Sequence, residues 1–277
     1  GKQISAEIKA EAAEEAAALK AKGITPCLAV VLVGDDSASQ VYVNNKKKAC
    51  EAVGIRSVSH VLSGGTTEEA LLELIAKLNA DKDIHGILVQ MPVPKQIDER
   101  KVILAIDPKK DVDCFHPVNV GNLHTGGEGF LPCTPAGIIE LIKRSGHSIE
   151  GKQCVVIGRS NIVGKPVAML LMQENGTVTI CHSKTRNLAE ICRGADIIVS
   201  AVGKVNTVTA DMVKGGAILI VGMNRNEAGK LCGDVDFENV KEIAGAITPV
   251  PGGVGPMTIA MLMKNCNTAA KIQNGLQ

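Results

Sequence analysis

Short apolar runs alternate with longer amphipathic segments along most of the chain. Leu28–Val33 is a continuous apolar run between Pro26 and Gly34, which is typical of a strand buried inside a parallel sheet. An Ala-, Glu- and Lys-rich segment at residues 2–22 precedes it, with apolar positions on one helical face and Gly23 placed to end the helix. The alternation continues with strands expected near 57–62, 85–90, 154–157, 178–181, 197–200, 218–221 and 246–247, and helices over 39–53, 67–78, 135–144 and 258–272. This pattern predicts βαβ units and an α/β fold, with helices on both faces of parallel sheets.

Two segments interrupt the alternation. Residues 107–134 accumulate Asp, Pro, Gly and His without periodicity, and residues 249–256 (PVPGGVGP) are expected to lack regular structure. A loop as long as the first is usually functional or disordered in a compact domain. Because a βα series lies on either side of it, we expect two α/β lobes around a cleft, one of residues 1–139 plus 257–277 and the other of residues 140–256.

Composition restricts the classes of function. The 277 residues are 45% hydrophobic and 21% charged, as in an ordinary globular protein. A formal net charge of +1, one Tyr, three Phe and no Trp provide neither the basic surface nor the stacking platform of a nucleic-acid-binding protein. No segment has the length of a transmembrane helix, and no signal peptide opens the chain. We therefore expect no nucleic-acid partner and no membrane association.

The cysteine pattern bears on compartment and on metal binding. Nine cysteines without a CxxC pair indicate buried free thiols rather than a disulfide framework, which favours the reducing environment of the cytoplasm. Cys114, His116, His124 and Cys133 are residue types that bind zinc, but their spacing matches no common finger or ribbon. We therefore expect no metal site.

The stretch from Cys154 to Pro166 carries the strongest local signal for a ligand. A β-branched run stops at Gly158, turns through polar residues to Gly164 and then opens a helix, which is the arrangement that binds phosphate on backbone N–H groups. A Walker A loop is excluded, because five residues separate the two glycines and Pro166 stands where the magnesium-binding hydroxyl would be. A strict GxGxxG is also absent. The sequence therefore predicts a dinucleotide-binding turn of unusual spacing, in a Rossmann-type second lobe.

A few polar residues of the first lobe stand outside ordinary helix surfaces. Tyr42 and Lys46 are four residues apart and share a helix face, although a solvated charge run beginning at Lys46 is the simpler interpretation. Gln90 ends an apolar strand before a proline, where an ordinary polar residue is the alternative. Asp111 and Asp113 alternate so that both carboxylates point the same way, with Asx turns as the alternative.

Seven motifs follow one another along nearly the whole chain. They are GDDSASQVYVNNKKKAC (34–50), VQMPVP (89–94), PKKDVDCFHPVNVG (108–121), PCTPAG (132–137), GRSNIVGKP (158–166), CHSKT (181–185) and PVPGGVGPMT (249–258). Together they resemble the motifs of the bifunctional methylenetetrahydrofolate dehydrogenase/methenyltetrahydrofolate cyclohydrolases, and they occur in the same order as in that family. The resemblance implies a folate-binding catalytic lobe formed by residues 1–139 plus 257–277 and an NADP-binding Rossmann-like domain formed by residues 140–256.

The resemblance also implies roles for individual residues. Lys46 is then the catalytic lysine, Gln90 contacts it, and Asp113 anchors the pterin ring. The remaining substrate-binding positions are Tyr42, Pro251, Gly252 and Gly253. The cofactor-binding positions are Gly158, Arg159, Ser160, Ile162, Gly164, Ser183, Gly222 and Met223. Arg159 and Ser183 correspond to the residues for the 2′-phosphate of NADP, although an Arg beside the pyrophosphate alone is an open alternative.

The expected function is oxidation of 5,10-methylenetetrahydrofolate with NADP, followed by hydrolysis of the methenyl product to 10-formyltetrahydrofolate, in a cytoplasmic homodimer. The alternatives are a monofunctional dehydrogenase, which the intact set of first-lobe residues argues against, and a nucleotide-binding sensor without catalysis. An unrelated oxo-acid dehydrogenase would need a His or Arg pair, which we do not find. The chain departs from the family at one point, because an Asp is missing between Ile220 and Val221. A real deletion is expected to shift Gly222 and Met223. If the Asp is only missing from the recorded sequence, the measured mass of the protein would be one aspartate higher than the mass calculated from that sequence.

Overall fold

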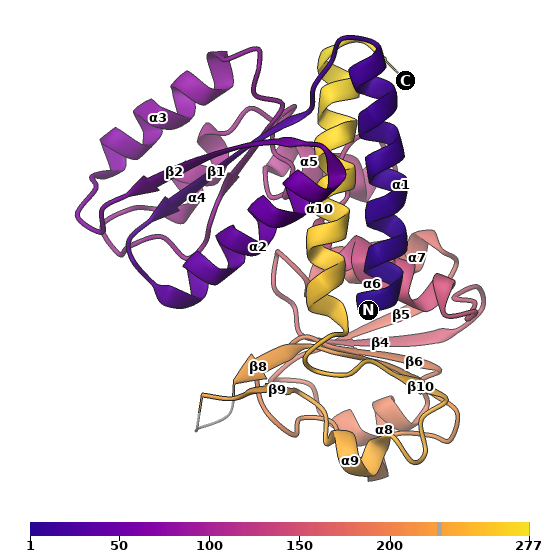
Figure 1. Ribbon diagram of the computed structural model, residues 1–277. Helices are drawn as coiled ribbons and strands as arrows, with labels where there is room; N and C mark the ends of the chain where they lie inside the picture. Colours follow the sequence, from indigo (N-terminus) through magenta and orange to yellow (C-terminus); the bar gives the residue numbers. More distant parts are fainter. Residues whose placement is uncertain (226–228, 277) are drawn as a thin grey trace. The chain divides into compact units, whose positions relative to one another are not determined.

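The computed structural model describes residues 1–225 and 229–276 (Figure 1). The chain divides into two compact units. Unit 1 is Gly1–Ser5 with Thr134–Thr258, and unit 2 is Ala6–Cys133 with Ile259–Gln277. Each unit contains its own parallel sheet, so the predicted α/β class is confirmed. In the part of the chain that the structure describes, no helix has the length and apolar character needed to cross a bilayer.

The sheet of unit 2 has the strand order β2-β1-β3. All pairs are parallel, and β1 (Cys27–Val33) lies between β2 (Arg56–Leu62) and β3 (Gly86–Val89). Every residue of β1 is buried, as its uninterrupted apolar sequence predicts for a central strand covered on both faces. The carboxyl end of β3 is followed directly by Gln90, so this edge of the sheet presents a polar side chain.

Helices cover both faces of this sheet (Figure 1). Helices α3 (Glu68–Ala80) and α4 (Glu99–Ala105) pack on one face, where Leu71 and Ile75 share a core with alternate residues of β1. Helix α2 (Ser37–Val53) lies on the other face and contacts β1 and β2. Both α2 and α3 have well-formed ends, because the side chains of Asp36 and Thr67 accept N-terminal N–H groups.

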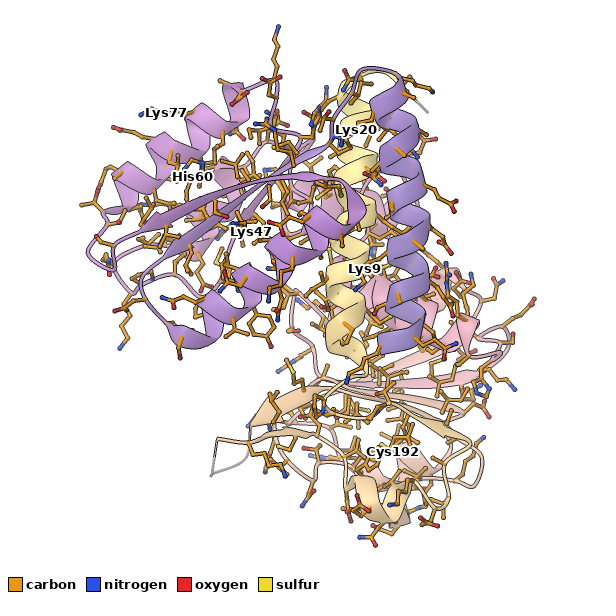
Figure 2. All side chains as sticks on the ribbon, viewed as in Figure 1. Lys9, Lys20, Lys47, His60, Lys77 and Cys192 are labelled. Carbon is orange, nitrogen blue, oxygen red and sulfur yellow. The ribbon has the colours of Figure 1, made fainter. Side chains whose placement is uncertain are left out.

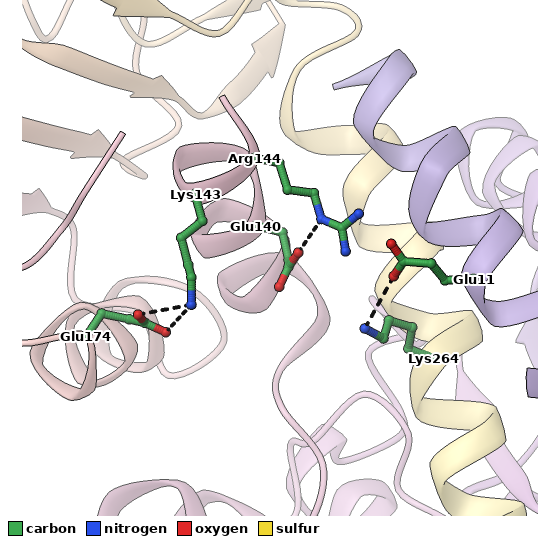
Figure 3. A network of polar contacts seen from close by, with 6 residues as sticks. All are labelled: Glu11, Glu140, Lys143, Arg144, Glu174 and Lys264. Atoms are coloured by element: carbon green, nitrogen blue, oxygen red, sulfur yellow. Dashed lines mark hydrogen bonds and ion pairs between the residues drawn. The ribbon is translucent and has the colours of Figure 1, made fainter. Parts of the chain in front are cut away.

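Two long helices lie side by side in unit 2 for most of their length (Figure 1). They are α1 (Lys2–Ala21) and α10 (Val254–Gln273). The buried amide of Asn267 donates to the carbonyl oxygen of Ala12 at 2.8 Å, and Glu11 pairs with Lys264 at 3.9 Å (Figure 3). The buried bond of Asn267 therefore helps to set the register of the two helices, with the ion pair of Glu11 and Lys264 as a more exposed contact.

Unit 1 is built on a five-stranded parallel sheet of order β10-β7-β6-β4-β5. The strands are β4 (Gln153–Ile157), β5 (Thr177–Cys181), β6 (Ile197–Ser200), β7 (Ile218–Val221) and β10 (Ala246–Ile247). The helical segments are α6 (Cys133–Arg144), α7 (Gly164–Gln173), α8 (Leu188–Arg193), η1 (Ala210–Met212) and α9 (Phe237–Val240). Chain order reverses direction between β4 and β6, which is where α/β sheets of this kind bind ligands.

The interior of unit 1 is aliphatic and closely packed. One core cluster joins α8 to the sheet and includes the buried thiol of Cys192, labelled in Figure 2. On the surface, Lys143 of α6 forms an ion pair with Glu174 at the end of α7, with a shortest distance of 3.0 Å (Figure 3). An exposed pair of this kind adds little to stability, so burial of aliphatic side chains is the main stabilising term.

Several elements differ from the sequence prediction. Residues 107–134 are not irregular throughout, because α5 (Pro117–Thr125) forms there with His116 as its N-cap and Gly126 as its left-handed C-cap. Nine residues are too few for a helical period to stand out in sequence. The last helix begins at Val254 rather than at 258, and a hairpin of β8 (Met223–Arg225) and β9 (Leu231–Gly233) was not predicted. Helix α4 was also missed, although Asp98 caps it.

Candidate active site and cofactor site

A lysine and a carboxamide meet in unit 2. The Nζ atom of Lys46, on α2, donates to Oε1 of Gln90 at 2.9 Å. The amide of Gln90 is itself oriented, because its Nε2 donates to the carbonyl oxygen of Met91 at 2.8 Å. Both side chains are half-buried. Lys46 is therefore fixed by a neutral partner, which orients the amine without adding a negative charge beside it.

Asp113 lies within electrostatic reach of this pair. Its side chain keeps part of its surface exposed, but desolvation raises the pKa of the carboxyl from 3.8 to about 6. The charge of Lys46 acts in the opposite direction, and the charge of Asp111 adds to the rise. Carboxyl groups with raised pKa values occur preferentially at functional sites. Lys46, Gln90 and Asp113 are thus brought together from three separate segments of the chain.

Asp111 is placed differently from Asp113, although both were expected to point the same way. Asp111 is buried, and its carboxylate accepts from the backbone N–H groups of Phe115 (3.2 Å) and His116 (2.8 Å) and from the amide of Asn119 (2.8 Å). These bonds use both carboxylate oxygens within the protein. Asp111 therefore organises the loop, and Asp113 is the carboxylate that remains partly accessible.

Tyr42 lies one turn before Lys46 on α2 and is 37% exposed. Pro251, Gly252 and Gly253 belong to unit 1 and form a tight turn just before α10. Gly252 has a φ of +103°, and a Cβ at Gly253 would lie 2.6 Å from the carbonyl oxygen of Pro249. Gly252 and Gly253 therefore cannot be replaced by larger residues without changing the turn.

Unit 1 contains a cavity of about 320 Å³ at the carboxyl ends of its central strands. Ile157 pairs with Ser200 and Ser200 pairs with Val221, so β4, β6 and β7 end at the same level. Among the expected cofactor residues, Ser160, Ile162, Gly222 and Met223 line this cavity. Its other lining residues are Thr134, Ile138, Val163, Ser200, Ala201, Gly203, Ile220, Asp234, Val254, Gly255 and Thr258.

Gly158 and Gly164 form the turn that closes one side of this cavity. Gly158 has a φ of +119°, and a Cβ on Gly164 would lie 2.4 Å from the carbonyl oxygen of Gly158. The Oγ of Ser160 accepts from the N–H groups of Val163 and Gly164, both at 3.2 Å, and so ties the turn to the start of α7. The strand, turn and helix therefore fit a dinucleotide whose phosphates approach the backbone.

Arg159 and Ser183 follow the carboxyl ends of two neighbouring strands. The N–H of Gly158 donates to the carbonyl oxygen of Cys181 at 2.9 Å, which joins the ends of β4 and β5 just before these two residues. Both side chains are exposed, and neither lines the cavity. The loop after the second strand of a Rossmann-type unit is the position that faces the adenosine ribose of a bound dinucleotide.

Asp234 is a residue of the cavity that the sequence did not identify. It is fully buried, and its Oδ2 accepts from the N–H groups of Val202 (2.9 Å) and Gly203 (3.2 Å), which hold the loop after β6. Gly222 must lack a side chain here, because its Cβ would lie 2.7 Å from that same oxygen. With Val221 directly after Ile220, β7 still delivers Gly222 and Met223 to the cavity wall.

The residues considered as zinc ligands have other contacts. The thiol of Cys114 donates to the carbonyl oxygen of Phe130 at 3.2 Å, and that of Cys133 to Val112 at 3.4 Å. Burial raises the pKa of both thiols, which disfavours the thiolate that zinc needs. Within residues 1–225 and 229–276, no group of three or more His, Cys, Asp and Glu side chains is arranged to hold a metal ion.

The fold and the two sites define an α/β dehydrogenase with a dinucleotide-binding unit and a lysine–carboxamide–carboxylate site in its other unit. A family model described as the tetrahydrofolate dehydrogenase/cyclohydrolase catalytic domain matches residues 1–113. A second, described as the NAD(P)-binding domain of the same family, matches residues 132–274. The chain belongs to the tetrahydrofolate dehydrogenase/cyclohydrolase family.

Relatives agree over the full length of the chain. The bifunctional protein FolD of Acetivibrio thermocellus is 61% identical over 274 residues, which cover 99% of this chain and 96% of the relative. The crystal structure of FolD from Campylobacter jejuni is 52% identical with a TM-score of 0.95, covering 98% of this chain and 97% of that one. FolD from Trypanosoma brucei, solved with NADP and an inhibitor, is 41% identical with a TM-score of 0.93, covering 98% and 96%.

The motif-based resemblance is confirmed by these comparisons. The chain is a bifunctional enzyme with dehydrogenase and cyclohydrolase activity on one-carbon derivatives of tetrahydrofolate, and NADP is its cofactor.

Proposed function

We propose that Lys46, Gln90 and Asp113 form the site at which 5,10-methylenetetrahydrofolate is oxidised and its methenyl product is hydrolysed to 10-formyltetrahydrofolate. The observation that carries this proposal is the 2.9 Å bond between Lys46 and Gln90 beside Asp113. Residues 1–139 with 257–277 form the folate-binding lobe in this proposal, and residues 140–256 form the NADP-binding domain.

The oxidation asks little of the protein in acid–base terms. Bound NADP would supply the hydride acceptor for the bridging carbon of the folate, and the two flanking nitrogens would share the positive charge that remains. No strong base is needed, so the contribution of the protein is alignment of the substrate. Tyr42 packs against the folate in this proposal, and Pro251, Gly252 and Gly253 are the further substrate-binding positions.

The hydrolysis requires proton transfer. Water adds to the cationic carbon and loses one proton as the C–O bond forms. The bond from that carbon to N5 then breaks while the new hydroxyl loses its second proton, which leaves the formyl group on N10 and an N–H on N5. Lys46, as the free amine, is positioned to take the first proton and to pass it to N5, and the second proton is released to water. Gln90 holds the amine in place through Oε1 without introducing a competing charge. Asp113 accepts from the amino and ring N–H groups of the pterin.

Asp113 makes the affinity for folate depend on pH. Because its pKa is raised to about 6, the carboxylate is ionised above this pH and progressively protonated below it. We expect KM for the folate substrate to rise as pH falls through about 6, by about tenfold for each further unit, since the ionised fraction falls by that factor. Steady-state kinetics between pH 5 and pH 8 measures this, and the trend should disappear in Asp113→Asn.

The same ionisation has the opposite sign for folding. The folded protein binds more protons than the unfolded chain between the ordinary pKa of 3.8 and the raised value of about 6. Its stability should therefore decrease as pH rises through that window, and the Asp113→Asn variant should lack this component.

For folate binding, a KM of the wild-type enzyme that stays constant down to pH 5 would contradict the proposed role of Asp113.

Arg159 and Ser183 bind the 2′-phosphate of NADP in this proposal, and Gly158, Ser160, Ile162, Gly164, Gly222 and Met223 hold the rest of the dinucleotide. The planar guanidinium suits a phosphate monoester. Arg159→Ala should raise KM for NADP about 10- to 100-fold, as expected for lost charge-assisted bonds, and change KM for NAD little. Arg193→Ala is a matched control, because that exposed arginine of unit 1 bonds the carbonyl oxygen of Asp211 instead.

The assay follows the growth of reduced nicotinamide absorbance with purified enzyme and 5,10-methylenetetrahydrofolate. No growth with either cofactor would contradict the dehydrogenase activity itself. A higher kcat/KM with NAD than with NADP would contradict only the assignment of Arg159.

The assembly we propose is a cytoplasmic homodimer. Strand β5 is an edge of the unit 1 sheet, and Ile180 on it is 38% exposed, while Met172 on the neighbouring helix α7 is 49% exposed. An edge strand with exposed apolar side chains favours pairing with another chain. The nine cysteines are free, as in a reducing compartment.

A further inference from the structure

Asp113 sits in a short segment whose neighbours are held from several directions. We call residues 111–114 the carboxylate loop. On one side, the N–H of Ile87 in β3 donates to the carbonyl oxygen of Lys110 at 2.8 Å, and Asp111 forms an isolated parallel bridge with Ile87. On the other side, Cys114 takes a left-handed conformation with a φ of +61° and turns the chain away. The side chain of Asp113 is thus set by the backbone on either side of it.

Val112 is fully buried within the carboxylate loop. Its side chain packs onto β3 so closely that a Cβ on Gly86 would lie 2.7 Å from Val112 Cγ1. The carbonyl oxygen of Val112 accepts a hydrogen bond from the Nδ2 of Asn265 at 2.8 Å. It also accepts the weaker thiol bond from Cys133. The peptide unit that leads into Asp113 therefore depends on a side chain 153 positions further along the chain.

Asn265 lies on α10 and is buried, and its amide nitrogen donates hydrogen bonds to two backbone carbonyl groups of this region. Besides Val112, its Nδ2 donates to the carbonyl oxygen of Leu131 at 2.8 Å. Leu131 precedes α6, so one carboxamide joins the backbone on either side of the segment that contains α5. Buried carbonyl groups that lose their donor are costly, and the backbone would shift to recover a partner.

We infer that Asn265 is a positioning residue for folate binding, acting through the carboxylate loop on Asp113. The inference rests on the proposed role of Asp113 as the pterin-binding carboxylate. Asn265 touches neither the reacting atoms nor the cofactor cavity. Its contribution is to keep the Asp113 carboxylate at the position and orientation that the pterin N–H groups require, since a displacement of about 1 Å is enough to weaken such contacts severely.

The chain supplies a matched control two residues further along the same helix. Asn267 is also buried, and its Nδ2 also donates to two acceptors, the carbonyl oxygen of Ala12 at 2.8 Å and Oε2 of Glu15 at 3.4 Å. Both of these acceptors belong to α1. Replacing Asn267 by Ala therefore removes an equivalent buried amide from α10 without releasing the carboxylate loop.

The experiment compares Asn265→Ala and Asn267→Ala in the full-length enzyme by steady-state kinetics with 5,10-methylenetetrahydrofolate and NADP. Both variants should show a lowered Tm. Only Asn265→Ala should raise KM for the folate, by about tenfold, which is the effect of losing one well-placed hydrogen bond, with KM for NADP changed less than about twofold. An unchanged folate KM in Asn265→Ala, or an equal rise in Asn267→Ala, would overturn the inference.

A second measurement keeps the inference testable if Asn265→Ala folds poorly. In an Asp113→Asn background, Asn265→Ser, which retains one donor, should raise the folate Kd by less than about twofold further, because the two residues act as a unit. If Asn265→Ser raised the folate Kd in this background by the same factor as in the wild-type enzyme, Asn265 would act independently of Asp113, and the inference would be overturned. If Asp113→Asn alone leaves folate binding unchanged, the proposed function of Asp113 fails instead, and the two failures are distinguishable.

Discussion

Lys46→Met should abolish cyclohydrolase activity, with a fall of about 10²- to 10⁴-fold, while folate binding remains measurable. General acid–base catalysis by a positioned side chain is worth this much, and Lys46 is the amine that bonds Gln90 and interacts electrostatically with Asp113. Methionine keeps the length and apolar stem of lysine but cannot carry a proton. The oxidation step relies on alignment rather than on proton transfer, so dehydrogenase activity should fall much less. Cyclohydrolase activity is measured as the loss of methenyltetrahydrofolate absorbance when this compound is the substrate.

Lys47→Met is the control for this experiment. Lys47 is adjacent on the same helix and is exposed; it is labelled in Figure 2. The same change of charge at this position should leave both activities within about twofold of the wild type, since surface substitutions of this kind are usually nearly neutral. Retained hydrolysis in Lys46→Met would remove the assignment of the catalytic lysine. Loss in both variants would point to the net charge of α2 rather than to one side chain.

Most of the secondary structure could be predicted because its signals are local. The run from Cys27 to Val33 is apolar at every position, and it forms the buried central strand of unit 2. Thr67 caps the start of α3 by accepting a bond from the N–H of Ala70, and Gly54 ends α2 with a φ of +84°, which glycine adopts without strain. The elements that were missed are short and acquire their stability from tertiary contacts; they are α4, α5, α8, η1, α9 and the antiparallel pair β8 and β9.

In the candidate site too, individual residues could be identified from the sequence, whereas most of their contacts depend on the tertiary structure. Lys46 and Gln90 were identified separately, and the resemblance predicted their contact, because no local pattern joins residues 44 positions apart. Asp111 and Asp113 looked equivalent from their spacing, yet the carboxylate of Asp111 accepts bonds from the loop, whereas Asp113 is partly exposed and interacts electrostatically with Lys46. Their difference depends on where the chain turns after Asp113.

Asp234 and Asn265 were not predicted at all. Each is a single polar residue in a stretch with no distinctive composition, and each matters because of backbone groups far away in sequence. Asp234 holds the N–H groups of Val202 and Gly203, and Asn265 holds the carbonyl groups of Val112 and Leu131. A sequence shows which residues can form such bonds, but only the folded chain determines which donors and acceptors are left without a partner.

Gly164→Ala should weaken NADP binding by more than about 100-fold, which corresponds to about 3 kcal/mol of lost binding free energy. A Cβ at this position would lie 2.4 Å from the carbonyl oxygen and 2.6 Å from the carbonyl carbon of Gly158, and 2.9 Å from the backbone nitrogen of Arg159. All three are backbone atoms of the turn itself, so no side chain can move aside. The turn must open, and the residues on it, including Ser160 in the cavity wall, move with it.

Gly215→Ala supplies the comparison for this variant. Gly215 is in the same unit, is exposed, and has no atom within 4 Å of the position that a Cβ would take. It should bind NADP like the wild type and keep its Tm or gain slightly, because alanine restricts the unfolded chain. Isothermal titration of NADP into both variants, with Tm measured in parallel, separates a damaged turn from a damaged fold. Near-normal affinity in Gly164→Ala would mean that the dinucleotide does not depend on this turn, and the cofactor site would then have to be sought elsewhere along the ends of β4, β6 and β7.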